Sequence, residues 1–187
     1  GTLFPYTTLF RSGIEGLPED YVESPAGFDS LEELGIYEAV PCEASWYRLP
    51  DGALHMMHRT GEGALAVARS EDRGETWTKP LVTEYTDLGN RMHFGNLPDG
   101  RAFGLSTPRP GGVRAPLVLS LSDDGWEFDR NYVLGDDANF MAWLPGMHKY
   151  GRYGYPYFCC DDRYGYALYS VNKEDIWVAR VHLEDLV

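Results

Sequence analysis

The stretch that decides the fold is SEDRGETW, residues 70–77. Ser70 and Asp72 carry short polar side chains that can hydrogen-bond to the backbone of a turn, and Gly74 can adopt the positive φ that a tight turn needs. Trp77 supplies a large ring that can pack against neighbouring strands. The stretch therefore predicts a rigid turn between two β-strands.

A second stretch, LSDDGWEF, ends at Phe128 and resembles the first. Its glycine lies 51 residues after the glycine of the first stretch. Aligned on that glycine, the second copy keeps Asp123, Gly125 and the aromatic Phe128. Leu121 stands where a serine is expected, and Glu127 stands where a threonine is expected. The second copy is therefore a degenerate version of the same turn.

A different turn signal repeats at nearly the same distance. The sequence Leu-Pro-Asp-Gly occurs at residues 49–52 and again at 97–100, a shift of 48. An Asp-Gly pair between two apolar runs is a strong β-hairpin signal, because glycine supplies the positive φ of the turn. Two independent turn signals thus share a period near 50 residues. This period fits one four-stranded blade of a β-propeller.

The repeat predicts where the strands lie. The first blade is expected at residues 45–49, 53–59, 64–69 and 76–80, and the second at 91–97, 101–106, 116–120 and 128–134. A third unit is expected at 153–160, 166–171 and 176–182, with a turn at 161–165. We therefore expect residues 38–187 to be all-β and to form a partial β-propeller of about three four-stranded antiparallel blades. Such a set makes an arc and not a ring.

The N-terminal residues carry a different signal. Residues 2–12, TLFPYTTLFRS, resemble the one-frame translation of a common short-read sequencing adapter. We expect residues 1–12 to be a non-native segment, which is excluded from fold reasoning. Residues 13–37 are rich in proline and glycine and are expected to form an irregular loop from a preceding blade. The natural sequence is therefore expected to start inside a longer gene, and any signal peptide would precede it.

Composition argues against several function classes. The formal net charge is −13, so nucleic acid and anionic membranes are poor partners. The longest apolar stretches, such as residues 117–121, are far too short to span a bilayer. Cys42, Cys159 and Cys160 give an odd count without the CxxC spacing of a metal site. Neither a disulfide framework, a metal nor a cofactor is expected.

Residues 70–77 match every fixed position of the Asp-box pattern, S/T-x-D-x-G-x-T-W/F. The chain thereby resembles the sialidase superfamily, whose β-propellers carry these boxes (also called BNR repeats). The resemblance implies the C-terminal half of a six-bladed propeller from an exo-acting glycoside hydrolase. Such an enzyme removes terminal acidic sugars from glycans and is expected outside the cell or in the periplasm. The boxes themselves imply only the fold, because non-enzymatic propellers also contain them.

The resemblance also implies site residues. Sialidases bind a sugar with a carboxylate beside its anomeric carbon, and guanidinium groups bind carboxylates bidentately. That carboxylate repels a carboxylate nucleophile, so the family uses a tyrosine hydroxyl that a glutamate deprotonates. The implied nucleophile is Tyr155 and its base is Glu43, while Arg59 and Arg114 are implied to bind the substrate carboxylate. The four residues occur in the family's order and with similar spacing.

Other interpretations stay open for each of these residues. Arg59 could pair with a nearby acid at the rim, and Arg114 could be an exposed loop charge. Glu43 could be a solvated strand-end charge, and Tyr155 could serve packing alone. The family usually has a small polar residue after the nucleophile, whereas Pro156 follows Tyr155 here.

Two other functions also remain open. The chain could belong to a non-catalytic glycan-binding propeller, or to a related enzyme that acts on another glycan containing uronic acid. The family's first arginine and its acid aspartate belong to earlier blades. Sequence preceding this chain would therefore discriminate between these functions.

Overall fold

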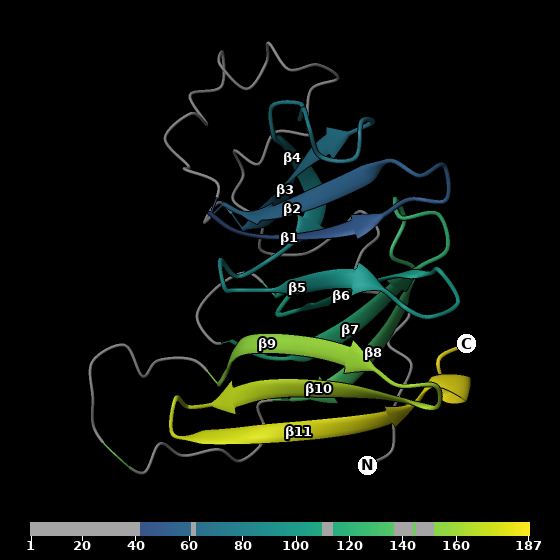
Figure 1. The fold of residues 1–187 in the computed structure, drawn as a ribbon. Helices are drawn as coiled ribbons and strands as arrows, with labels where there is room; N and C mark the ends of the chain where they lie inside the picture. The colour runs from purple at the N-terminus through teal and green to yellow at the C-terminus, as the bar shows by residue number, and fades with distance from the viewer. Residues whose placement is uncertain (1–41, 61–62, 110–113, 137–143, 145–151) are drawn as a thin grey trace.

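The computed structural model describes residues 42–60, 63–109, 114–136, 144 and 152–187, which contain eleven β-strands in three antiparallel sheets (Figure 1). The first sheet contains β1 (Cys42–Arg48), β2 (Leu54–Arg59), β3 (Ala64–Ser70) and β4 (Leu81–Thr86). The second contains β5 (His93–Asn96), β6 (Ala102–Ser106), β7 (Leu117–Ser122) and β8 (Arg130–Gly135). The third contains β9 (Tyr153–Cys160), β10 (Tyr164–Val171) and β11 (Asp175–His182), followed by a short 3-10 turn, η2 (Leu183–Asp185).

The sheets follow one another as an arc. Within each sheet, strands adjacent in sequence are adjacent in space. The first strands of the three sheets lie side by side, since β1 contacts β5 and β5 contacts β9 (Figure 1). The predicted all-β arrangement of successive antiparallel sheets is confirmed. The third sheet has three strands in the described part of the chain, one fewer than a full blade. The segments predicted at residues 1–12 and 13–37 lie outside the described residues.

The two Leu-Pro-Asp-Gly turns have the same geometry. The backbone N–H of Leu49 donates to Ala53 O (2.8 Å), the N–H of Gly52 donates to Leu49 O (2.9 Å), and φ of Gly52 is +89°. The turn at residues 97–101 repeats both bonds, at 2.8 and 3.0 Å, with φ of +95° at Gly100. The hairpin prediction is therefore confirmed in both sheets.

The last strand of each four-stranded sheet starts later than predicted. Residues 76–80 were expected to be a strand, but Thr76 is bound within the turn by two hydrogen bonds to Asp72, so β4 begins at Leu81. Phe128 was expected to open β8, but its ring turns into the core and the strand begins at Arg130. In both cases the box residues are used by the turn and its packing before the strand can begin.

The first box is a closed hydrogen-bond network. Ser70 Oγ donates to Asp72 Oδ1 (2.8 Å), and Ser70 Oγ accepts from the N–H of Gly74 (2.8 Å). Thr76 donates to Asp72 through both its N–H and its hydroxyl, and these bonds lower the pKa of Asp72 to about 2. Trp77 Nε1 donates to Gly74 O (3.0 Å), so the indole folds back over its own turn.

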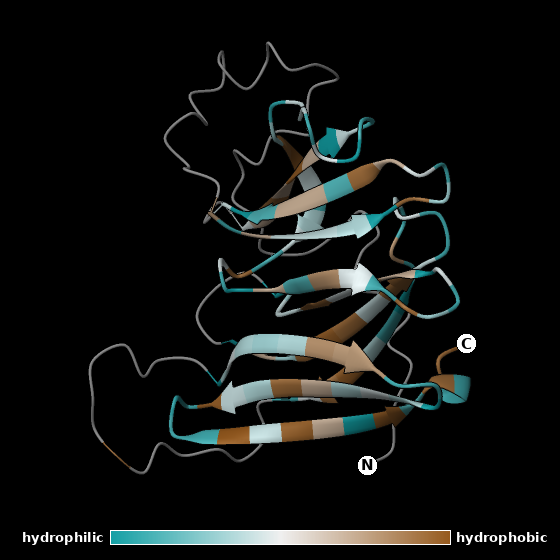
Figure 2. Ribbon diagram, viewed as in Figure 1, coloured by the Kyte–Doolittle hydropathy of each residue, from teal (hydrophilic) through white to brown (hydrophobic). Residues whose placement is uncertain are grey.

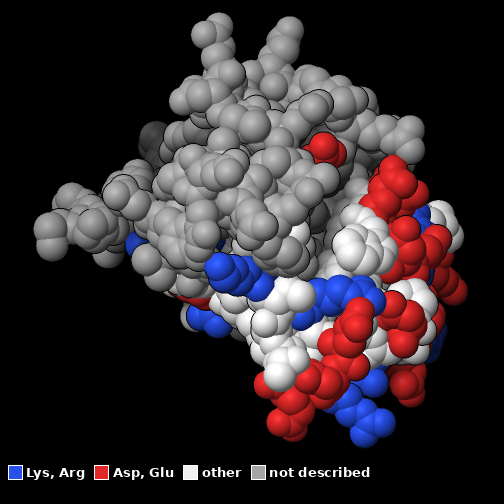
Figure 3. Space-filling model, turned by 90° about the horizontal axis from the view of Figure 1, so that it is seen from above, with Lys and Arg blue, Asp and Glu red and all other residues white. Residues whose placement is uncertain are grey.

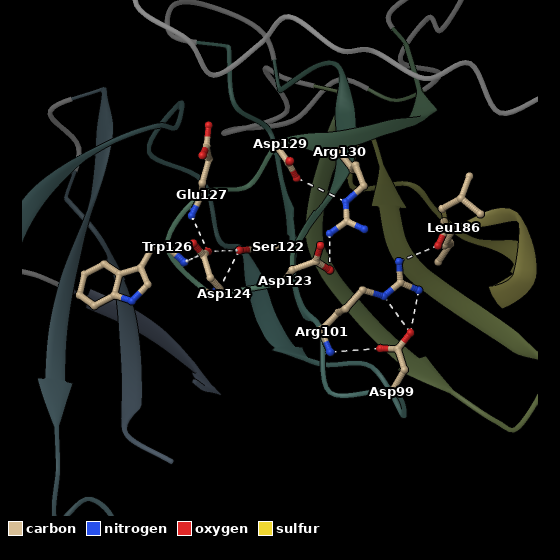
Figure 4. A network of polar contacts seen from close by, with 12 residues as sticks. Asp99, Arg101, Ser122, Asp123, Asp124, Trp126, Glu127, Asp129, Arg130 and Leu186 are labelled. Atoms are coloured by element: carbon tan, nitrogen blue, oxygen red, sulfur yellow. Dashed lines mark hydrogen bonds and ion pairs between the residues drawn. The ribbon is translucent and has the colours of Figure 1, made fainter. Parts of the chain in front are cut away.

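The second box has a different register from the predicted one (Figure 4). Ser122 Oγ donates to Asp124 Oδ1 (3.0 Å) and accepts from the N–H of Gly125 (2.8 Å). Ser122 and Asp124 thus make the hydrogen bonds that Ser70 and Asp72 make in the first box. The prediction that assigned the serine and aspartate positions to Leu121 and Asp123 is therefore wrong by one residue. One residue is absent between the aspartate and the glycine.

Two hydrophobic cores join the sheets. Between the first and second sheets, Tyr47, Tyr85, Phe94 and Phe128 form an aromatic cluster with ring centroids 5.4–5.8 Å apart. A second core joins the second and third sheets and includes leucines of β7 and the Phe103–Phe158 ring pair. Figure 2 shows the hydrophobic residues of these strands in brown. Phe128, the last residue of the second box, therefore packs between two sheets, as predicted for the box aromatic.

Candidate functional site

Glu43 and Arg59 form an ion pair at one end of the first sheet. Glu43 lies at the start of β1 and Arg59 ends β2, where it pairs with Cys42 across the ladder. Arg59 Nη1 donates to Glu43 Oε2 at 2.5 Å, and each side chain is about one third exposed (35% and 33%). This hydrogen bond raises the pKa of Arg59 above its ordinary value. The structure thus brings together two of the four predicted residues.

Glu43 and Tyr155 share an unusual backbone conformation. Both have left-handed φ angles, 51° for Glu43 and 54° for Tyr155. The other described non-glycine residues with positive φ, Arg73, Asn172 and Lys173, lie in turns, whereas Glu43 and Tyr155 lie within strands. Each lies where the ladder register of the first strand of its sheet shifts, between Cys42 and Ser45 in β1 and after Gly154 in β9. Such bulges re-aim side chains, and positive φ in a residue as bulky as tyrosine is a genuine outlier. Strain of this kind gathers at functional sites.

Arg114 lies beside the start of β9. Its carbonyl accepts a hydrogen bond from the N–H of Tyr153 (2.9 Å). A Cβ added to Gly154 would lie 3.2 Å from Arg114 Nη1, so the guanidinium occupies the space next to Gly154. Tyr155 is the following residue and is 49% exposed, with Lys173 Nζ 5.8 Å from the centre of its ring. Arg114 therefore lies next to the residue that precedes Tyr155, at one end of the third sheet.

Asp87 is a buried carboxylate near both arginines, and it was not among the residues predicted for the site. Its side chain accepts hydrogen bonds from the N–H groups of Gly89 (2.7 Å) and Asn90 (3.0 Å). Burial raises the pKa of Asp87 to about 7, although Arg59 and Arg114 act in the opposite direction. The carboxylate thus lies within the electrostatic reach of both guanidinium groups. The Asp-Leu-Gly-Asn sequence at residues 87–90 is a turn signal, but nothing in it distinguishes a buried aspartate from an exposed one.

The loop at residues 87–90 ties the three sheets together at this end. Its backbone N–H groups donate to Gly63 O (2.9 Å), before β3, and to Thr107 O (3.1 Å), after β6. The side-chain amide of Asn90 donates to Tyr153 O (3.1 Å), at the start of β9. The ends of the sheets that carry the candidate residues are therefore held in fixed relation to one another.

His93 on β5 makes a second connection to β9. Its Nδ1 accepts a hydrogen bond from the N–H of Phe158 (3.0 Å), and its ring stacks on Tyr157 with centroids 4.3 Å apart. Burial lowers the pKa of His93 to about 4, so the imidazole is neutral at pH 7. These contacts give His93 a structural role between two neighbouring strands.

Several features set limits on the chemistry of the described residues. The Glu43 carboxylate bonds to Arg59, and the Tyr155 hydroxyl makes no hydrogen bond to it. Within the described ranges, no cluster of three or more His, Cys, Asp or Glu side chains could hold a metal ion. The same residues contain no helix with the length and apolar character needed to cross a membrane. All three cysteines are unpaired.

Arg59 and Arg114 belong to a chain with a strong excess of acidic residues. The sequence contains 29 acidic side chains against 16 lysines and arginines. Figure 3 shows acidic side chains close together among the described residues of one face, with single basic groups between them. Arg59 and Arg114 are therefore local exceptions, and their attraction for a carboxylate acts at short range.

The BNR repeat-like domain family matches residues 32–167. No curated protein matches the chain. Similar solved structures include a sialidase, with a TM-score of 0.56 and 24% identity, covering 79% of this chain and 14% of that one. A mutant of the NanB sialidase from Streptococcus pneumoniae has a TM-score of 0.55 and 22% identity, covering 77% of this chain and 24% of that one.

The intramolecular trans-sialidase from Ruminococcus gnavus, in complex with oseltamivir carboxylate, has a TM-score of 0.51 and 22% identity, covering 76% of this chain and 33% of that one. At these identities the similarity shows the fold, which is that of sialidase propellers. The chain spans between 14% and 33% of the length of these three proteins. Since the family match extends over most of its length, the chain belongs to the BNR repeat-like domain family.

Proposed function

We propose that this chain is the C-terminal part of an exo-acting, sialidase-like glycoside hydrolase that removes terminal acidic sugars from glycans. The observation that carries the proposal is the shared conformation of Glu43 and Tyr155. Both stand on left-handed bulges near the start of the first strand of a sheet. Glu43 is bonded to Arg59, and Arg114 lies next to Gly154, the residue before Tyr155. Strained backbone at two corresponding positions favours a functional role over a packing role.

Arg59 and Arg114 would bind the carboxylate of the sugar. A guanidinium group presents a planar fork that can donate two parallel hydrogen bonds to one carboxylate. Their joint proximity to Asp87 supports a common location at the ends of the sheets. The trans-sialidase of similar fold was solved with oseltamivir carboxylate, which is itself a carboxylate ligand.

Tyr155 would act as the nucleophile. Its hydroxyl oxygen forms a bond to the anomeric carbon while the glycosidic C–O bond breaks, and Glu43 takes the hydroxyl proton. The leaving oxygen takes a proton from an acid in the part of the propeller outside this chain. Water then gives a proton to that acid, which now acts as a base, and attacks the same carbon. The bond between this carbon and the tyrosine oxygen breaks, Glu43 returns its proton to the tyrosine, and the sugar leaves with its configuration retained. Arg59 and Glu43 form an ion pair, so Glu43 would have to serve both Arg59 and Tyr155.

The activity would belong to a longer protein. Three sheets form an open arc, so water would reach the candidate residues from one side and would weaken electrostatic stabilisation of the transition state. The chain alone is expected to have no hydrolase activity. Turnover of a fluorogenic sialoside by the purified chain would contradict this expectation.

The experiment uses the full-length protein and a pair of matched tyrosine variants. Tyr155→Phe removes the nucleophilic oxygen and should abolish turnover, while much of the substrate binding remains. Tyr157→Phe is the control, because Tyr157 lies two residues along the same strand and is similarly exposed (53% against 49%). Arg59→Lys keeps the charge but loses the fork, so KM should rise more than kcat falls. Near-normal turnover in Tyr155→Phe would show that the tyrosine assignment is wrong.

A further inference from the structure

A cavity of about 750 Å³ lies between the first and second sheets, apart from the candidate site. Its lining includes none of the four predicted site residues. One wall comes from β1–β4, including Tyr47, His55 and Tyr85, and the other from residues 124–129 of the second box and Asn131 of β8. The volume falls within the range of small-molecule sites, about 300–1,000 Å³.

Trp126 gives this cavity an aromatic wall. It is 61% exposed, and its ring meets the His55 ring edge to face with centroids 4.4 Å apart. Figure 4 shows the indole pointing away from the box, on the side of the first sheet. Arg69 Cζ also lies over the ring, 5.6 Å from its centre. The part of the indole that His55 and Arg69 leave exposed offers a flat apolar surface on which the C–H face of a sugar ring can stack.

Two buried acceptors line the same cavity without hydrogen-bond partners among the described residues. They are His55 Nε2 and Asn131 Oδ1, in side chains that are 2% and 3% exposed. Burial lowers the pKa of His55 to about 4, so the ring is neutral. Tyr47 donates its single hydroxyl proton to Gly125 O (2.7 Å), so His55 Nδ1 donates to the Tyr47 oxygen and Nε2 is left as an acceptor.

A ligand that donates hydrogen bonds would satisfy the two unpaired acceptors. Buried polar atoms in native proteins are normally paired, and an orphaned acceptor costs about 1–3 kcal/mol. Both atoms are screened from solvent, so a ligand reaches them only if the cavity wall shifts. Trp126 is the exposed side chain that packs on the His55 ring, and it is therefore the part of the wall that would move.

The charge of the lining limits the ligand further. Four carboxylates line the cavity (Glu84, Asp124, Glu127 and Asp129), and no lysine or arginine is among the lining residues. Arg69, which lies over the Trp126 ring, is paired with Asp51 and Glu71. Carboxylates accept hydrogen bonds from hydroxyl groups but repel an anionic sugar. The lining therefore favours a ligand with several hydroxyl groups, an apolar ring face and no negative charge.

We propose that this cavity is a second carbohydrate site that binds a neutral pyranose. The ring stacks on Trp126, and its hydroxyl groups donate to His55, Asn131 and the carboxylates. This site would hold the neutral part of a glycan, whereas the candidate site at Arg59 and Arg114 would bind an acidic sugar. The proposal does not depend on hydrolase activity.

The test is a calorimetric titration of the 187-residue chain with methyl β-D-galactopyranoside and methyl β-D-glucopyranoside. At least one should bind saturably, with a Kd in the millimolar range. Trp126→Ala should weaken binding about tenfold or more, which is about 1.4 kcal/mol. Trp46→Ala is the matched control, because Trp46 is also exposed (53%) but does not line the cavity. It should bind as the unmodified chain does.

Asn131→Leu distinguishes a loss of binding from a loss of folding. It removes an unpaired buried acceptor, so it should leave the melting temperature unchanged or higher while it weakens binding. Tyr155→Phe should bind both glycosides normally, which separates this site from the proposed hydrolase site. No saturable binding of either glycoside, equal binding by Trp126→Ala, or preference for glucuronic acid or for the cation glucosamine would overturn the proposal.

Discussion

The packing between the first two sheets can be tested by substituting alanine for Gly125 and, as a control, for Gly52. Both glycines have positive φ, 77° at Gly125 and 89° at Gly52. A Cβ at Gly125 would lie 2.2 Å from Leu49 Cδ2 and 3.1 Å from Tyr47 Cε2. A Cβ at Gly52 would meet nothing within 4 Å. The substitutions Gly125→Ala and Gly52→Ala therefore share backbone strain and differ in steric overlap.

The expected magnitudes follow from these contacts. An alanine at positive φ costs about 1–2 kcal/mol, and this cost applies to both variants. At Gly125 the overlap must also displace Leu49 and Tyr47, which are 3% and 2% exposed. Overpacking of a closed core costs about 1–3 kcal/mol more. We therefore expect a loss of about 1–2 kcal/mol for Gly52→Ala and about 2–5 kcal/mol for Gly125→Ala.

Urea denaturation of the 187-residue chain, followed by circular dichroism and tryptophan fluorescence, measures both losses. The m-values should agree among the variants, because the same surface is exposed on unfolding. If Gly125→Ala does not fold while Gly52→Ala folds normally, the larger cost at Gly125 is still shown. Equal losses for the two variants would refute the packing of the second box against the first sheet.

Two further predictions concern aspartates. Burial raises the pKa of Asp87 to about 7 from 3.8, so this group's contribution to stability is complete below pH 3.8 and is lost as the pH rises through about 7. Urea denaturation at pH 4, 6 and 8 measures the free energy of unfolding of Asp87→Asn and of the unmodified chain. The value for Asp87→Asn should rise relative to that of the unmodified chain as the pH increases, by up to about 4 kcal/mol, and a difference that does not change with pH would contradict the burial of Asp87. Asp124 accepts hydrogen bonds from Ser122 Oγ and two backbone N–H groups, so Asp124→Ala should cost about 1–3 kcal/mol. Asp123→Ala should cost less than about 1 kcal/mol, because Asp123 makes an exposed ion pair with Arg130. A larger loss for Asp123→Ala than for Asp124→Ala would show that Asp123 is the aspartate of the box, as the sequence alignment predicted.

The sheets could be predicted from the sequence because their turns are determined locally. An Asp-Gly pair needs positive φ wherever it lies, and the hairpins at residues 49–52 and 97–100 depend on nothing outside themselves. The repeated spacing then predicted the succession of sheets. The strand ends were less predictable, because Thr76 and Phe128 are taken by the turn and the core before a strand can start.

The register of the second box was not predictable by aligning glycines. Gly125 follows Asp124 directly, whereas one residue separates the equivalent pair in the first box. The ladder resolves this ambiguity, since Ser70 pairs with Leu54 and Ser122 pairs with Ala102 at the same place in each sheet. Pairing between distant strands is tertiary information that a local pattern does not contain.

The candidate site was predicted only through the family resemblance. Nothing in the local sequence indicates the left-handed bulges at Glu43 and Tyr155, because a bulge is defined by the partner strand. Asp87 was missed because its sequence resembles an ordinary exposed turn, while three sheets converge on it in the fold. Burial of a charged group depends on those long-range contacts.

Covalent labelling of the full-length protein tests the central claim most directly. A 2,3-difluorinated sialic acid loses fluoride from its anomeric carbon when a nucleophile attacks, and the second fluorine slows hydrolysis of the resulting ester or ether. Proteolysis and mass spectrometry then locate the bond. We predict a single adduct on the peptide that contains Tyr155, at the tyrosine oxygen, which Tyr155→Phe abolishes and Tyr157→Phe retains. The absence of an adduct, or an adduct on another residue of the chain, would contradict the account.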